Sequence, residues 1–438
     1  MVMTRKCILT MAILILAVFM CACGKSDEGA GETPMGNAAP ADNIAKFILV
    51  DNTNNEEEEV PVEAAAEREL AAQIEKGYNL PIEESEREEA TDDCKRIMEL
   101  IFGIYESADK GIASNVVLSD ETVLEIQDRV AEIGCPVHTT LRYSNMRNYE
   151  VMDDFLKRCT EGESGSVVMY EVCSDGDIGR RKYVFDGTDM YVLSTTSIWN
   201  QNNQPGIAYV SYTRIKEWKY TAKGWFGYEL CVPEPPEVTK IVDGSCLIKV
   251  KPMTDEQRDF SERCVLGLGY QGNNLLCFDW DAEHLEDLDY NGMYEYLYRI
   301  KQQMRFDSED YPNGIPKDEF ESLIMEYLPV TAEQIREYAV FDEENQTYAW
   351  ARLGCFNYAP DFFGTSLPEV TDIKENEDGT ITLTVDAVCD MVVNDDAVIT
   401  HELTIQMKED GSFQYLGNKI LNDGIRHVPE YQYRFKSR

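Results

Sequence analysis

The stretches ITLTVDAVC at residues 381–389 and ITHELTIQM at residues 399–407 decide the fold of the C-terminal part. In both stretches apolar residues alternate with polar ones, which is the pattern of a β-strand with one covered face. Asp-Gly pairs at residues 378–379 and 410–411 are typical of hairpin turns. We therefore predict an antiparallel sheet whose apolar face packs beneath helices formed by residues 317–340.

Residues 91–250 change from a helical period to a strand-like pattern. Apolar residues recur every three or four positions over residues 91–108 and 119–133, which predicts two helices, and a third is expected at 149–159. Residues 164–250 then contain many aromatic and β-branched residues between Gly-containing turns. An antiparallel β-meander is the simplest structure for that region.

The predicted fold class is α+β, with N-terminal helices and an aromatic-rich antiparallel β-meander, then a C-terminal module of helices and antiparallel sheet. Residues 24–61 have few bulky apolar side chains, so they cannot bury enough surface to offset chain entropy. Four parts are expected: a signal peptide at 1–22, an acidic flexible stalk with a short helix at 23–90, helices plus meander at 91–250, and a helical segment plus sheet at 251–438.

The N-terminus has the layout of a secretory signal. Arg5 and Lys6 precede an apolar run from Ile8 to Met20, and small residues lead to Cys23. The run is shorter than the roughly 20 residues that a membrane-spanning helix needs. The pattern matches a bacterial lipobox, so Cys23 is the predicted site of acylation, for instance by palmitate. A plain signal peptide with an incidental cysteine, or an uncleaved anchor, are the alternatives.

This signal predicts a lipoprotein at the cell membrane, held by its lipid anchor and facing outside. The net charge of −41 would repel nucleic acid phosphates, so no nucleic acid partner is expected. The sequence leaves the identity of a protein or glycan ligand open.

Thirteen cysteines are present, of which ten remain after the signal and Cys23 are set aside. An even number in an exported protein permits disulfides, whereas wide spacing and apolar surroundings favour free buried thiols. Both alternatives stay open.

The segment from Asp287 to Glu295 resembles the first half of a calcium-binding loop. Asp287, Asp289 and Asn291 place oxygen donors at positions 1, 3 and 5, and Glu295 stands at position 9. Tyr298 replaces the glutamate expected at position 12. A calcium site is one interpretation, and a helix cap at Asn291 is the other. No other cofactor is predicted.

Three tryptophans of the meander are candidate ligand-binding residues. Trp199, Trp218 and Trp225 could stack on sugars or a peptide. Aromatic residues in strands more often serve as core and cross-strand pairs, which is the alternative.

No motif identifies a catalytic residue. Residues 267–272 match GxGxxG, but no strand–turn–helix unit surrounds them, so a glycine-rich turn is expected. Ser164 precedes a strand instead of following one, unlike a nucleophile elbow. His401 alternates with apolar residues and is expected to be a hydrogen-bonded core histidine. Whether the protein is an enzyme stays uncertain, and the pattern leans against it.

Several phrases resemble a known family: GWFGYELCVPEPPEV at 224–238, VLGLGYQGNNLLCFDWD at 265–281, LDYNGMYEYLY at 288–298 and SLPEVTDIKENEDGTITLTVDAVCD at 366–390. They are similar to a family of uncharacterised lipoproteins, with a domain of unknown function, from anaerobic Gram-positive bacteria. The resemblance implies a membrane-anchored surface protein without an assigned activity.

Together these patterns predict an extracytoplasmic lipoprotein that binds a ligand or serves the cell envelope without catalysis. The alternative is a hydrolase that cleaves cell-wall polymer or glycan with carboxylates. Two close carboxylates with raised pKa values in a deep cleft would favour the hydrolase.

Overall fold

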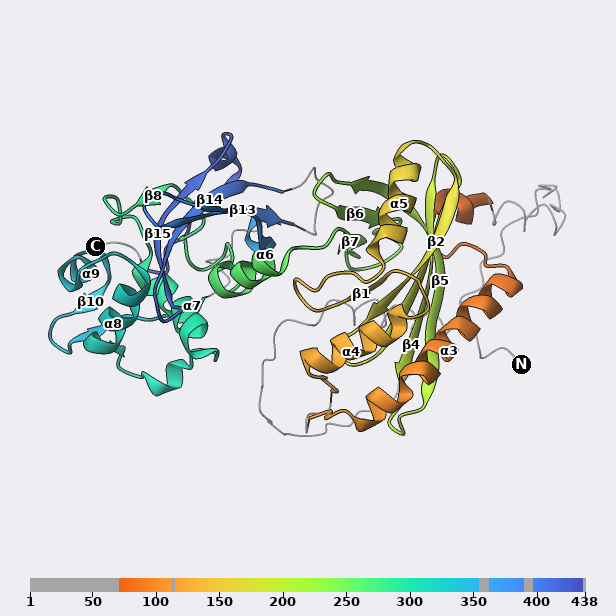
Figure 1. Ribbon diagram of the computed structural model, residues 1–438, viewed down its shortest axis with the longest axis horizontal. Coiled ribbons are helices and arrows are strands. Elements are labelled where there is room, and N and C mark those ends of the chain that lie inside the picture. The colour runs from red at the N-terminus through yellow and green to blue at the C-terminus, as the bar shows by residue number, and fades with distance from the viewer. Residues whose placement is uncertain (1–70, 112–114, 354–361, 390–396, 436–438) are drawn as a thin grey trace, which may run out of the picture. The chain divides into compact units, whose positions relative to one another are not determined.

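The computed structural model describes residues 71–111, 115–353, 362–389 and 397–435 (Figure 1). These residues belong to one compact unit that spans residues 60–438. Helices combine with two large, mainly antiparallel sheets, so the predicted α+β class is confirmed. Within the described ranges, no helix combines the length and apolar character needed to cross a bilayer.

The first large sheet has seven strands in chain order, from β1 to β7. Strands β2 to β7 are antiparallel to their neighbours, which confirms the predicted meander, whereas β1 runs parallel to β2. The strands are β1 (Val137–Thr139), β2 (Gly165–Val172), β3 (Ile178–Phe185), β4 (Met190–Trp199), β5 (Pro205–Tyr220), β6 (Trp225–Leu230) and β7 (Ser245–Lys249).

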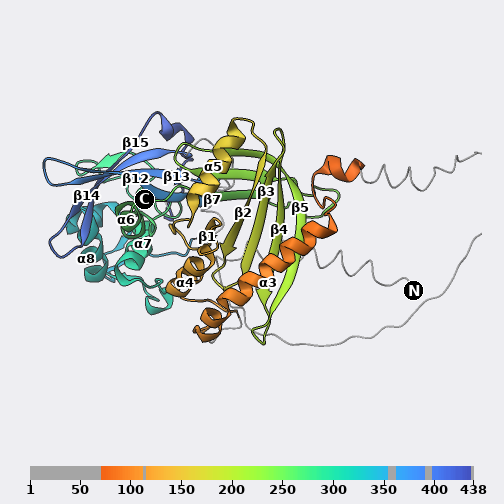
Figure 2. The ribbon, with the colours of Figure 1, turned by 45° about the vertical axis from the view of Figure 1, so that its right-hand side comes forward.

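Three helices cover both faces of this sheet: α3 (Glu84–Ser107), α4 (Asp120–Ala131) and α5 (Tyr149–Thr160). Along β2, Met169 packs in a core with α5, whereas the next residue, Tyr170, packs in a second core with α3 and α4. Figure 2 shows α3 running obliquely across the strands. Burial on both faces explains why β2 contains a run of apolar residues instead of a strict alternation.

Helix α3 begins at Glu84, seven residues before the start predicted at Thr91. The additional turns are acidic, so apolar periodicity could not identify them. Within these turns Glu89 pairs with the buried Arg180 of β3 at 3.1 Å, and Arg180 also pairs with Asp93, in the next turn, at 2.9 Å. The ion pairs thus align the helix on the sheet.

Side-chain caps begin two of the helices. The Oγ of Ser119 accepts a hydrogen bond from the Thr122 N–H at 3.2 Å and begins α4. Thr331 and Gln334 form a reciprocal capping box at the start of α9 (Ala332–Tyr338). Both helix starts are therefore fixed by side chains within three residues along the chain.

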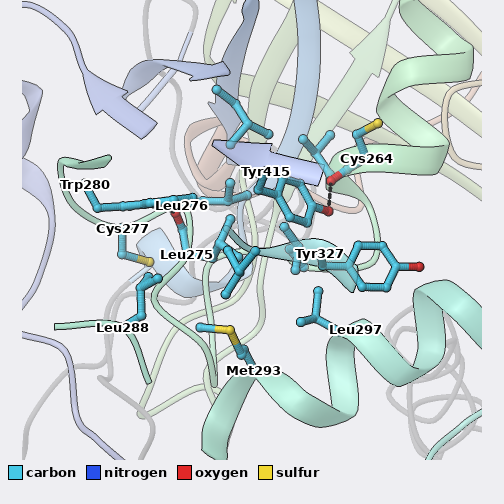
Figure 3. Packing of buried hydrophobic residues seen from close by; sticks show 14 of the residues in the cluster. Cys264, Leu275, Leu276, Cys277, Trp280, Leu288, Met293, Leu297, Tyr327 and Tyr415 are labelled. Atoms are coloured by element: carbon cyan, nitrogen blue, oxygen red, sulfur yellow. Dashed lines mark hydrogen bonds between the residues drawn. The ribbon is translucent and has the colours of Figure 1, made fainter. Parts of the chain in front are cut away.

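The second large sheet is antiparallel, with strand order β12-β13-β14-β15-β8. Its strands are β12 (Leu367–Glu375), β13 (Ile381–Val388), β14 (Thr400–Met407), β15 (Phe413–Ile420) and the short β8 (Trp280–Asp281). Most of the apolar positions of β13 and β14 are buried, as the alternation predicted, whereas Ile381 and Met407 at the strand ends are partly buried. A hydrophobic core fills this face (Figure 3), where the Tyr415 hydroxyl donates to the Cys264 carbonyl at 2.6 Å.

The helices around this core are α6 (Asp255–Phe260), the π-helix η1 (Ser261–Val265), α7 (Tyr290–Gln302) and α8 (Lys317–Tyr327). Helix α6 lies against β12 and α8 against β15, so one of the helices expected in residues 317–340 does cover the sheet. A small sheet of β9 (Ile315–Pro316), β10 (Phe341–Asp342) and β11 (Thr347–Tyr348) lies beside α8.

Candidate functional site

The side chains of the predicted calcium segment already have partners within the protein. Asp289 is the cap of α7, because its Oδ1 accepts the Gly292 N–H at 2.8 Å. The Asn291 amide instead donates to the Ala349 carbonyl at 2.8 Å, so the cap proposed at Asn291 is wrong by two residues. In the part of the chain that the structure describes, no group of three or more His, Cys, Asp or Glu side chains is arranged to hold a metal ion.

Residues near the C-terminus bind this same segment. The Tyr431 hydroxyl donates to Asp289 Oδ2 at 2.8 Å, and the Tyr433 hydroxyl donates to the Asp287 carbonyl at 2.8 Å. Burial raises the pKa of Asp289, although its hydrogen bonds from the Gly292 N–H and the Tyr431 hydroxyl oppose the shift. The calcium site at Asp287, Asp289, Asn291 and Glu295 stays a prediction, and any bound ion would have to compete with these contacts.

Arg434 extends this contact to α7. Its buried guanidinium pairs with Glu295 and donates to the carbonyls of Ala351 at 3.0 Å and Gly272 at 3.2 Å. Glu295 is therefore engaged with an arginine that lies 139 residues later in the chain. Sequence spacing gave no signal for that pairing.

The GxGxxG segment is a turn, as expected, since the π-helix η1 precedes it where a dinucleotide site would have a strand. Its glycines are explained by close packing. A Cβ on Gly272 would lie 2.2 Å from the Tyr296 hydroxyl, and a Cβ on Gly267 would lie 2.4 Å from Ile300. The motif thus serves the core around α7.

The three candidate tryptophans do not share one surface. Trp199 stacks on Tyr105 of α3, with ring centroids 4.2 Å apart. Trp218 is half-buried and packs with the α5 core on the other face of the sheet. Trp225 is 7% exposed and lies beneath the ammonium group of Lys249, 4.9 Å from the ring centroid. A ligand-binding role for these tryptophans stays a prediction.

Cys23, the predicted acylation site, lies outside the described residues, as does Cys355. The nine other cysteines that lie after Cys23 are free thiols. The described part of the chain therefore holds its fold without a disulfide.

Two carboxylates meet on the polar face of the second sheet. Glu369 of β12 and Asp386 of β13 are direct cross-strand partners, and they are 2% and 0% exposed. Asp386 also accepts a hydrogen bond from the Thr400 hydroxyl at 2.7 Å. Adjacent acids are the arrangement that a carboxylate hydrolase would need.

Lysines of the first sheet cover these acids. Lys249 of β7 pairs with Glu369, and Lys223, from the turn between β5 and β6, pairs with Asp386. Burial raises the pKa of Glu369, and the nearby lysines partly offset the shift. Both carboxylates are buried, and each pairs with a lysine from the first sheet region, so the cluster links the two sheets.

An open groove lies elsewhere, where β5 and the segment after β6 meet residues 76–78. Its volume is about 810 Å³. We refer to it as the Arg214 groove. It is lined by Lys76, Tyr78, Arg214, Lys216, Glu229, Leu230, Cys231, Val232, Glu234, Pro236 and Glu237.

Most of the charges in the Arg214 groove are paired. Lys76 Nζ lies 3.0 Å from a Glu237 carboxylate oxygen, and the Tyr78 hydroxyl donates to the same carboxylate at 2.5 Å. Lys216 Nζ lies 3.0 Å from Glu229. These pairs cross from one wall segment to another, so they help to set the shape of the groove.

Arg214 and Glu234 differ from these ion-paired residues. Among the described residues, neither has an oppositely charged side chain within 4.0 Å. The Arg214 guanidinium donates to the Glu75 carbonyl at 3.2 Å, and a hydrogen bond with Cys231 raises its pKa. In the described part of the chain, the groove therefore presents a cation, Arg214, and an anion, Glu234, that form no ion pair of their own.

Sequence reasoning missed this groove because its walls come from three distant segments. Arg214 contacts Glu75, which is 139 residues earlier. The proline-rich segment at 233–236 was the one local sign, since it marks an irregular loop after a strand.

Comparison with protein families shows that the chain matches one of them over most of its length. The profile of a family of unknown function, DUF6070, matches residues 87–434. The chain matches no curated protein and no solved structure.

Proposed function

This chain belongs to DUF6070, a family of unknown function, and we propose that it is a lipid-anchored, extracytoplasmic protein that binds a ligand without catalysing a reaction. The proposed location at the membrane rests on the basic N-terminus, the short apolar run and Cys23. After cleavage, Cys23 would carry the lipid and tether the folded unit to the outer side of the cell membrane.

The Arg214 groove is the observation that supports binding. It is open, it is shaped by ion pairs between its walls, and it contains two charged groups, Arg214 and Glu234, that form no ion pair among the described residues. Ligand sites in proteins commonly have volumes of roughly 300–1,000 Å³, a range that includes this groove.

Hydrolysis of a cell-wall polymer or glycan is the second candidate. Its support is the adjacent pair of Glu369 and Asp386, with the raised pKa of Glu369. Their burial under Lys223 and Lys249 argues against it, since a substrate must reach the acids. Release of reducing sugar from purified cell wall, lost in Glu369→Gln, would establish the hydrolase instead.

The anchor is tested by growing cells with labelled palmitate. We expect the protein to carry label and to fractionate with membranes, and Cys23→Ser to abolish both. Cys21→Ser is the matched control, because that cysteine lies in the signal and should leave labelling intact. An unlabelled wild-type protein, or a labelled Cys23→Ser variant, would refute the proposed address.

A further inference from the structure

The two charged groups of the Arg214 groove that lack an ion-pair partner among the described residues, Arg214 and Glu234, indicate which ligand it can hold. We propose that the groove binds a short peptide, whose terminal carboxylate pairs with Arg214 and whose amino group pairs with Glu234. This proposal rests on the proposed binding function and adds the chemical class of the ligand.

Arg214 is fixed in place before any ligand arrives. Its backbone N–H donates to the Gly77 carbonyl at 2.7 Å, and its carbonyl accepts the Cys231 N–H at 3.0 Å. Gly77 has a φ of +77°, and a Cβ there would lie 3.1 Å from Arg214 Nε and 2.8 Å from Cys231 Sγ. A glycine is therefore required for the chain to approach the arginine this closely. Such preorganisation reduces the entropy lost on binding.

Neighbouring charges leave Arg214 and Glu234 as the groups that select a ligand. Glu237 is neutralised by Lys76, and Glu229 by Lys216. A guanidinium presents two parallel N–H donors that match a carboxylate. Glu234 is exposed on the loop after β6, and its carboxylate can accept hydrogen bonds from an ammonium group.

The charge of the whole chain favours a peptide over a simple anion. The chain has a net charge of −41, which repels small anions at long range. A peptide with free termini has compensating charges and is not repelled. Leu230, Val232 and Pro236 add apolar lining for its side chains.

The test uses the full-length lipoprotein in detergent and native mass spectrometry to count bound peptide. The probes are a pentapeptide library with free termini, the same library with amidated C-termini, and the same library with acetylated N-termini. We expect the free library to bind, and each blocked library to bind at least about tenfold more weakly, as loss of a charge-assisted pair implies.

Variants locate the site. Arg214→Gln should remove the preference for a free carboxylate, and Glu234→Gln should remove the preference for a free amino group. Arg258→Gln is the matched control, because Arg258 forms a surface pair with Asp255 far along the chain from the groove. If Arg214→Gln does not fold, the three libraries on the wild-type protein still decide the question.

Two results would overturn the peptide proposal. One is equal binding of the free and amidated libraries. The other is capture of cell-wall glycan fragments, lost in Arg214→Gln, with no peptide bound; that result would leave the binding function in place. Binding that neither groove variant alters would refute the groove itself.

Discussion

Lys249 of the seven-stranded sheet and Glu369 of the five-stranded sheet form an ion pair that is almost fully buried. The Lys249 side chain is 15% exposed and that of Glu369 is 2% exposed. One Glu369 oxygen, Oε2, has no hydrogen-bond partner in the described structure. Lys249 is thus the hydrogen-bonding partner of this carboxylate, and the pair is one of two lysine–carboxylate contacts described between the sheet regions.

Removing the lysine should leave a buried, unpaired carboxylate. We expect Lys249→Met to lower the free energy of unfolding by about 3–5 kcal/mol, measured in urea. The double variant Lys249→Met, Glu369→Leu should regain much of the loss, because no charge is then stranded. Arg258→Gln, which breaks a surface pair, should lose less than about 1 kcal/mol.

The same variant should respond to pH. Since burial raises the pKa of Glu369, the folded state takes up a proton more readily than the unfolded chain. The stability of Lys249→Met relative to wild type should therefore recover as the pH falls from 7 toward 5. A constant difference across that range would contradict this account.

Because His401 is buried in its neutral form, we expect the folded state to lose stability at acidic pH. Burial lowers the pKa of its imidazole to about 4, although a hydrogen bond with Asn418 opposes the shift. In the unfolded chain this histidine takes up a proton near pH 6.5. The contribution of neutral His401 to the free energy of unfolding is therefore fully present above pH 6.5 and is lost as the pH falls toward 4. The loss is at most about 3 kcal/mol. His401→Gln should lack this component, whereas the exposed His427→Gln should retain it, in unfolding curves at several pH values.

Tyr431 should matter more than Tyr433. Tyr431→Phe removes a hydrogen bond to the buried Asp289 carboxylate, and we expect a loss of about 1–3 kcal/mol. Tyr433→Phe removes a more exposed bond to a carbonyl, with an expected loss of about 0.5 kcal/mol. Equal melting temperatures for the two variants would show that the C-terminal contact is not part of the stable core.

The GxGxxG segment can be tested glycine by glycine. Gly272→Ala should destabilise strongly, because the new Cβ would lie 2.2 Å from the Tyr296 hydroxyl at a φ of +77°. Gly269→Ala also has a positive φ, +62°, but nothing lies within 4 Å of its Cβ. Gly269→Ala should therefore lose only about 1–2 kcal/mol of backbone strain. Denaturant midpoints in the reverse order would contradict the packing explanation.

Calcium binding at Asp287, Asp289, Asn291 and Glu295 is a separate question. Asp289 and Glu295 already accept hydrogen bonds from Tyr431 and Arg434, so we expect millimolar calcium to leave the melting temperature unchanged. Asp287→Ala should then behave like wild type with and without the ion. A calcium-dependent rise that Asp287→Ala removes would establish the site.

Local patterns predicted much of the fold. The caps at Ser119 and Thr331 and the meander after residue 164 follow from side-chain chemistry within a few residues. Patterns failed where distant charges decide the structure. The first turns of α3 lack an apolar stripe, and Glu86 and Glu89 there pair with Lys182 and Arg180 of a later strand.

The candidate site could not be predicted in the same way. Arg214 lies in strand β5, and the alternation of side chains along a strand indicates only the face of the sheet on which Arg214 lies. Its role depends on Glu75, Gly77 and Cys231, which reach it from other segments. A single sequence does not contain that proximity.

Asp386 marks the division between the two sources of information. The sequence by itself determined that it lies on the polar face of an antiparallel strand, because side chains in a strand alternate with a period of two. Only the tertiary structure decided that this face is buried, since Lys223 covers it from 163 residues away. The period-two alternation of a strand indicates the side of the sheet on which a residue lies. Whether that residue is buried and which partner it has depend on the surface that packs against that side.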